Sequence, residues 1–136
     1  MNADAALPQK GTRFTRSFTV TEAVHAGFIQ LFNDRHPYHT DDTAARSRGF
    51  RGKIMHGNIL SGFLSFFVGE CLPIKTVVIQ SQEINFHRPF YLHDALTLHA
   101  EVIDVYESVR TIEFRFFFEN QDKLKIAKGR LNIGYL

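Results

Sequence analysis

Hydrophobic and polar positions change their period along the chain, from helical in the first half to strand-like in the second. A loose alternation over Phe14 to Val20 predicts a first strand. Thr21 then predicts an N-cap, since its hydroxyl can accept a hydrogen bond from the first turn of a helix. The apolar residues of 22–32 recur on one side at helical spacing, so this segment predicts the first helix.

The next segment combines chain breakers with capping residues. Residues 33–40 hold a proline and two histidines, which predicts irregular chain. Thr40 predicts the cap of a short helix, with Asp41 and Asp42 in its first turn, where carboxylates complement the helix dipole. A glycine-containing connection over 48–56 leads to the next element.

The segment 57–70 predicts the most diagnostic helix. Its polar positions are mostly small residues, and a helix that is apolar almost all round is a buried helix. The apolar side chains that cover more than one of its faces are Ile59, Leu60, Phe63, Leu64, Phe66, Phe67 and Val68.

Strand patterns dominate the rest of the chain. The predicted strands are 76–86, 96–102, 112–118 and 124–135. An antiparallel sheet wrapped around the buried central helix is the simplest way to bury both, which makes the predicted fold class α+β.

Length and composition indicate one globular domain over residues 1–136, with 1–12 as a frayed N-terminal tail. The single cysteine, Cys71, has no partner for an internal disulfide, which favours a reducing cytoplasm. The longest apolar stretch, 59–68, is too short to span a bilayer, so no membrane role is expected.

Charge argues against one partner class and leaves another open. Sixteen basic and fourteen acidic residues nearly balance, without the basic stripe that is typical of nucleic-acid binders. Four cations do lie close together: Arg46, Arg48, Arg51 and Lys53. Such a cluster is either a solvated loop or a contact for the phosphates of a nucleotide-linked substrate.

One irregular loop carries dense polar chemistry. Asp34 and His39 can converge on a single water, while Pro37 restricts the preceding His36 to extended geometry. The same spacing also suits an Asx-type turn followed by a capped helix. Farther along, Gly57 precedes the central helix, where backbone N–H groups favour negative charge and can form an oxyanion hole. A tight loop-to-helix turn explains that glycine equally well.

Two stretches resemble a known family. The sequence FNDRHPYHTDDTAARSRGFRGKIMHGNILSGFLS is similar to the signature of the MaoC-like R-specific enoyl-CoA hydratases, in which an Asp, an Asn-Pro pair and a His precede an Ile-x-His-Gly entry to the central helix. The sequence IQSQEINFHRPFYLHDALTLHAEV resembles the family's later strand region, with Arg88-Pro89 and Asp94 at corresponding places.

The resemblance implies a hot-dog fold that adds or removes water across an enoyl thioester. It implies that Asp34 and His39 are the catalytic pair, that the Gly57 N–H binds the thioester oxygen, and that Ser65 supports the site. His36 stands where the family has Asn and is expected to support the loop together with Pro37.

The implied substrate is a thioester of coenzyme A or of an acyl carrier protein, and neither a cofactor nor a metal is expected. The resemblance also implies a homodimer, for which the sequence adds a reason. The strand 112–118 places Phe114, Phe116 and Phe118 on one face and Phe117 on the other, as expected of a strand covered on both sides.

Three other functions compete with this interpretation. A zinc site would use His36 and His39 with His56 as a distant third ligand, but the chain has no standard zinc-binding motif. A hot-dog thioesterase would carry an acidic group on or beside the central helix, which has only Glu70, at its far end. A non-catalytic acyl-thioester binding module would not need the Asp34 and His39 pair.

Overall fold

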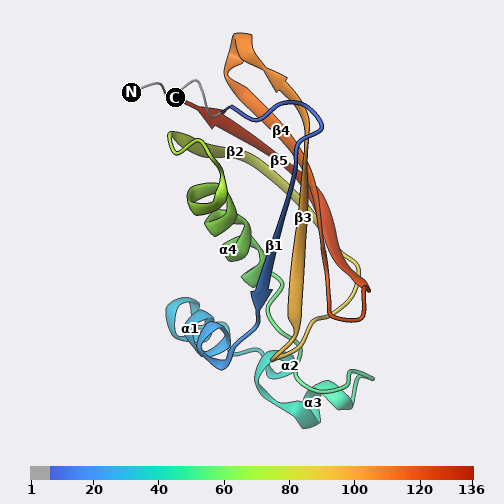
Figure 1. Cartoon of the computed structure of the whole chain (residues 1–136). Helices are drawn as coiled ribbons and strands as arrows, with labels where there is room; N and C mark the ends of the chain where they lie inside the picture. The colour runs from blue at the N-terminus through green and yellow to red at the C-terminus, as the bar shows by residue number, and fades with distance from the viewer. Residues whose placement is uncertain (1–6) are drawn as a thin grey trace.

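Five strands form one antiparallel sheet in the order β1-β3-β4-β5-β2 (Figure 1). The computed structural model describes residues 7–136. The strands are β1 (Arg13–Thr19), β2 (Val77–Phe86), β3 (Ala95–Tyr106), β4 (Thr111–Glu119) and β5 (Lys125–Tyr135). All four predicted segments of the second half are therefore confirmed as strands, with ends that differ by a few residues.

The helices precede most of the sheet in the chain. They are α1 (Glu22–Phe32), α2 (Pro37–Thr40), α3 (Asp42–Arg46) and α4 (Ile59–Phe66), followed by a π-helical turn η2 (Phe67–Cys71) and, after β3, a 3₁₀ turn η3 (Glu107–Val109). The helix α4 lies along one face of the sheet, whereas α1, α2 and α3 gather at one end of it (Figure 1). The polar loop of the sequence therefore lies beside the start of α4.

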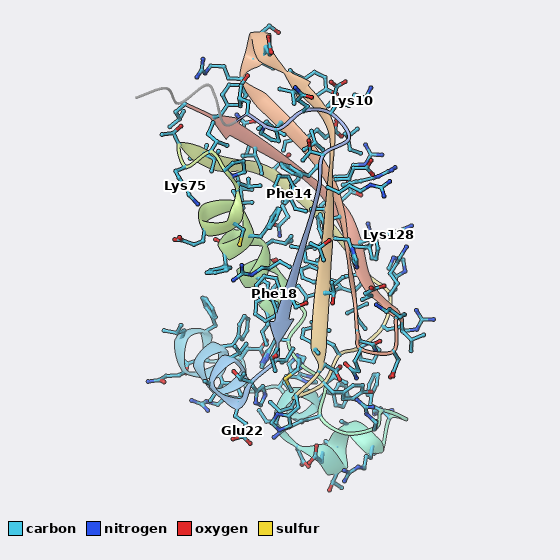
Figure 2. The ribbon with its side chains drawn as sticks, viewed as in Figure 1. Lys10, Phe14, Phe18, Glu22, Lys75 and Lys128 are labelled. Atoms are coloured by element: carbon cyan, nitrogen blue, oxygen red, sulfur yellow. The ribbon has the colours of Figure 1, made fainter. Side chains whose placement is uncertain are left out.

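The core fills the space between α4 and the sheet. Alternate residues of β4 point into it, as the period-2 pattern predicts. From β1, Phe14 and Phe18 also lie on the side that faces α4, whereas Lys128 of β5 lies on the opposite side (Figure 2). The largest fully buried side chains are Phe67, Phe90, Phe114, Phe118, Leu60, Leu64, Leu72, Leu96, Leu98, Ile112, Ile126 and Leu131.

The structure confirms the predicted first helix but not the predicted irregular chain over 33–40. The Thr21 hydroxyl accepts a hydrogen bond from the Val24 N–H at 3.1 Å, so Thr21 is the N-cap of α1. Residues 33–40 are not wholly irregular, because Pro37 begins a short helix whose first position tolerates a missing N–H. Thr40 therefore ends α2, and Asp41 caps α3 through its carboxylate.

The central helix is shorter and less covered than predicted. It begins at Ile59 instead of Gly57 and changes to π-helical geometry at Phe67. One side faces the sheet, and the opposite side is exposed within the single chain. The exposed residues on that side are Gly62, Ser65, Phe66, Gly69 and Glu70.

The predicted frayed tail is only partly testable, since residues 1–6 lie outside the described residues. The remainder of 1–12 is ordered against the sheet. Pro8 is buried, and the Gly11 N–H donates to the Val102 carbonyl at 2.8 Å. The Val102 N–H in turn donates to the Thr12 carbonyl at 2.9 Å, which extends the ladder of β1 beyond its formal start.

The outer face of β4 is charged, which corrects the prediction of two apolar faces. Arg115 pairs with Glu101 of β3 at 2.7 Å, and Phe117 stacks on the His99 ring at 4.6 Å. The single aromatic ring on this face is thus covered within the chain. None of the helices described for residues 7–136 is long and apolar enough to cross a membrane.

A substitution at Gly129 of β5 tests how closely β5 approaches β2. A Cβ there would overlap the Glu83 carbonyl oxygen of β2 and lie 2.9 Å from the Phe116 ring. We expect Gly129→Ala to lower the free energy of unfolding by about 2–3 kcal/mol, as overpacking does. Urea denaturation measures the loss. Gly62→Ala is the matched control, because a Cβ on Gly62 meets open space and alanine favours the helix. Equal stability of both variants would contradict the proposed close contact.

Candidate active site

The loop between α1 and α2 presents Asp34. Asn33 closes α1 with a left-handed backbone (φ 59°), so the chain turns sharply before Asp34. The carboxylate of Asp34 accepts a hydrogen bond from the His36 N–H at 3.3 Å, and Nδ1 of His36 accepts one from the Tyr38 N–H at 3.2 Å. His36 is therefore the N-cap of α2, a role that supports the loop.

His39 follows on α2 and is held at both its ring and its backbone. Its Nδ1 lies 2.8 Å from the Ile54 carbonyl oxygen. Since a carbonyl only accepts, Nδ1 carries the hydrogen and Nε2 is left as an acceptor. The backbone carbonyl of His39 accepts a hydrogen bond from Nε2 of His25 in α1 at 2.8 Å.

His56 completes the group from the turn before α4. Its side chain is buried, and Nε2 donates to the backbone carbonyl of Asp34 at 2.9 Å. Its ring centroid lies 4.0 Å from that of His39 at an interplanar angle of 31°. Burial lowers the pKa of His56, and the hydrogen bond to the Asp34 carbonyl only partly opposes this shift.

The turn that contains His56 also places Gly57 beside the predicted pair. Asn58, the N-cap residue of α4, makes no side-chain capping bond. The N–H groups of Ile59, Leu60 and Ser61 already donate to the backbone carbonyls three residues before them. Among the residues that the structure describes, this leaves the N–H groups of Gly57 and Asn58 for a ligand. A Cβ on Gly57 would come within 2.9 Å of the Phe86 ring. The lack of space for a side chain therefore explains the glycine, and no unusual φ is involved.

Two cavities meet at Asp34. The first, of about 550 Å³, is lined by residues that include Asp34, His39, His56, Gly57 and Arg88. The second, of about 930 Å³, runs between α1 and α4 with mostly apolar walls. Asp34, Phe28 and Asn58 line both. The arrangement suits a ligand with one polar reacting centre and an extended apolar part.

The other predicted site residues lie elsewhere. Ser65 is on the exposed side of α4 and lines neither cavity. The cations Arg48, Arg51 and Lys53 line neither cavity as well. Arg51 lies 4.1 Å from the Tyr91 ring centroid and 3.8 Å from the buried Asp94 carboxylate, where it ties the loop to the start of β3.

Sequence reasoning gave no supporting role to three residues around the predicted pair. His25 is buried in α1, where its place among apolar residues was the only signal. His56 is in direct contact with His39 and is not the distant residue that the zinc alternative assumed. Arg88 lines the first cavity while its guanidinium donates to the Lys125 carbonyl at 3.0 Å.

Within residues 7–136, Asp34, His39 and His56 form the one group whose candidate metal-ligand atoms all lie within 4.8 Å of one another. Carboxylate and imidazole are ligands that zinc accepts. One nitrogen of each imidazole, however, is engaged with a backbone carbonyl, Nδ1 of His39 with that of Ile54 and Nε2 of His56 with that of Asp34. The geometry fits acid–base chemistry on a small molecule better than metal binding.

Comparison with known proteins agrees with this geometry. Residues 4–116 match the family model described as a MaoC like domain. The (R)-specific enoyl-CoA hydratase of Aeromonas caviae is 29% identical over 119 residues, which cover 86% of this chain and 87% of that protein. A mitochondrial 3-hydroxyacyl-acyl-carrier-protein dehydratase of Arabidopsis thaliana is 27% identical over 120 residues, covering 86% and 70%.

Solved structures confirm the predicted fold. The (R)-hydratase of Aeromonas caviae superposes with a TM-score of 0.87 at 24% identity, over 95% of this chain and 98% of that one. This likeness establishes the hot-dog arrangement of sheet and central helix.

The lowered pKa of His56 predicts a pH dependence of stability. Below the ordinary histidine pKa of ~6.5 the unfolded chain binds a proton on His56 that the folded chain does not bind. The free energy of unfolding therefore decreases as the pH is lowered. His56→Gln removes this contribution. We therefore expect the stability advantage of the wild type over the variant to shrink between about pH 8 and about pH 5.5. Urea denaturation at each pH measures it, and an advantage that grows toward acid pH would contradict the assignment.

Proposed function

Because the chain belongs to the MaoC-like dehydratase family, we propose that it reversibly adds water to trans-2-enoyl thioesters and yields R-3-hydroxyacyl thioesters. The observation that carries this proposal is that Asp34, His39 and Gly57 line one cavity. The related hydratase of Aeromonas caviae and dehydratase of Arabidopsis thaliana support the reaction class, a hydro-lyase.

The hydrogen bonds of the site support the roles proposed for the pair. The Asp34 carboxylate and the unprotonated Nε2 of His39 are both acceptors, so together they can hold the two hydrogens of one water. The water oxygen attacks C3 of the enoyl thioester while Asp34 takes the leaving proton. The pair then returns a proton to C2, so that one whole water is added and the enzyme ends in its starting state.

Gly57 supplies the stabilisation of charge in this scheme. As the water oxygen adds to C3, negative charge develops on the thioester oxygen, and the backbone N–H of Gly57 donates to it. The N-terminal end of α4 favours negative charge at the same place. Removal of one such donor typically costs ~10²–10³ in rate. The reaction needs no metal and no redox cofactor.

The thioester is carried by coenzyme A or by an acyl carrier protein. In either case a phosphopantetheine arm must reach the first cavity. The cations Arg48, Arg51 and Lys53 line neither cavity and stay proposed as contacts for the phosphates outside it. Ser65 stays proposed as a supporting residue of the site. The lone cysteine, Cys71, supports a cytoplasmic location.

A homodimer accords with the exposed edge of the sheet. β2 is an edge strand of ten residues with one charged side chain, and Val78 and Ile79 are exposed on it. A long exposed edge with few charged side chains is a site for strand pairing, whereas the other edge, β1, carries two arginines. Pairing of two β2 edges would join the sheets and bring a second chain near the exposed side of α4.

Crotonyl-CoA is the test substrate for the proposed reaction. Loss of the enoyl absorbance without release of free thiol is expected, and chiral analysis should find the R-3-hydroxy product. Thiol release would indicate a thioesterase instead. Tight binding of the thioester with neither change would indicate a binding module.

Substitution of the pair tests its role. We expect Asp34→Asn and His39→Gln each to lower kcat/KM at least ~10²-fold, because each removes a proton-transfer group from a preformed site. The melting temperature should stay near that of the wild type. Asp122→Asn, in the exposed β4–β5 turn, is the matched control. Wild-type turnover in both site variants would show that the loop is structural.

The dimer proposal predicts the mass in solution. Light scattering at micromolar concentration should give twice the chain mass of 15.6 kDa. Val78→Lys places a charge on the β2 edge and should shift the mass toward one chain, whereas Val109→Lys, on an exposed turn, should not. A wild-type protein of single-chain mass would overturn the proposal.

A further inference from the structure

Two buried histidines make the same contact with the two members of the proposed pair. His56 donates from Nε2 to the backbone carbonyl of Asp34 at 2.9 Å. His25 donates from Nε2 to the backbone carbonyl of His39 at 2.8 Å. His25 is 8% exposed and His56 is 2% exposed, so both donor side chains are largely shielded from water. Each reacting residue is thus held through its main chain by a different histidine.

The loop needs such anchors, because its own contacts are weak. Asp34 is exposed, and its carboxylate makes only a long bond, of 3.3 Å, to the His36 N–H. His39 lies on a helix of four residues, which has little stability of its own. Elements outside the loop must therefore fix the separation between the two side chains.

The anchors come from two segments outside the loop. His25 belongs to α1, and His56 belongs to the turn that begins α4. The two rings lie 5.8 Å apart, and the Phe28 ring covers His56 at 4.5 Å. The titratable groups that face His56 are His25 from α1 together with Asp34 and His39 from the loop.

We propose that His25 and His56 are positioning residues, which hold the main chains of His39 and Asp34 so that both side chains reach the same water. This inference rests on the proposed function. It assigns each anchor a hydrogen bond from Nε2–H to a carbonyl and assigns no proton transfer to either.

Four variants separate the hydrogen bond from the space that the ring fills. His25→Phe and His56→Phe keep a ring and remove the donor, whereas His25→Gln and His56→Gln extend an amide N–H to about the place of Nε2. We expect each Phe variant to lower kcat for crotonyl-CoA at least ~10-fold, because a small misplacement of reacting groups is costly. KM should change less than about threefold, since the cavities keep their walls.

Each Gln variant should recover most of the lost kcat, and Asp122→Asn, in the exposed β4–β5 turn, is the control. Melting temperatures identify any loss due to unfolding. A Phe variant with wild-type kcat, or a Gln variant as impaired as the Phe variant at equal stability, would overturn the inference while leaving the proposed function intact.

A second measurement does not depend on activity. Long-range ¹H–¹⁵N spectra of the wild-type imidazoles should show the Nε2–H tautomer for His25 and His56 and the Nδ1–H tautomer for His39. The opposite tautomer at His25 or His56 would remove the proposed anchor. Correct tautomers in a protein that does not hydrate crotonyl-CoA would support the anchors and contradict the proposed function alone.

Discussion

The site depends on how the segment Ile54–Gly57 is fixed between the loop and the sheet. The Met55 N–H donates to the Phe90 carbonyl at 2.9 Å, which ties the segment to the chain that leads into β3. On the other side, the Ile54 carbonyl accepts from the His39 ring and His56 donates to the Asp34 carbonyl. Four consecutive residues thus orient both members of the proposed pair and then deliver Gly57 to the start of α4.

Packing of α4 explains why this segment stays in place. Leu60 and Leu64 are fully buried against the sheet, and Phe67 continues the same side through the π-helical turn. Apolar burial of this extent is the main force that fixes one helix on a sheet. Packing of α4 in the core therefore also fixes the position of the helix start and of Gly57. The exposed side of α4 and the free edge of β2 are then the surfaces that a single chain leaves uncovered.

Local patterns predicted most of the elements, because period and capping are properties of neighbouring residues. Alternation gave the strands, and Thr21 gave the start of α1. The same local view failed at Thr40, since Pro37 at a first helical position made a helix where breakers suggested irregular chain. The pair of Asp34 and His39 was predicted from a motif. Their anchors were not, because His25 and His56 approach the loop only through tertiary packing, which no short-range spacing reports.

The central claim is that Asp34 and His39 act together on one water. A double-variant analysis tests it most directly, with kcat/KM for crotonyl-CoA measured for Asp34→Asn, His39→Gln and the protein that carries both. When two groups act as a unit, the substitution of one already removes the contribution of both to kcat/KM. The double variant should therefore be about as impaired as the worse single variant. A loss in the double variant equal to the product of the two single losses would show that the residues act independently and would contradict the account.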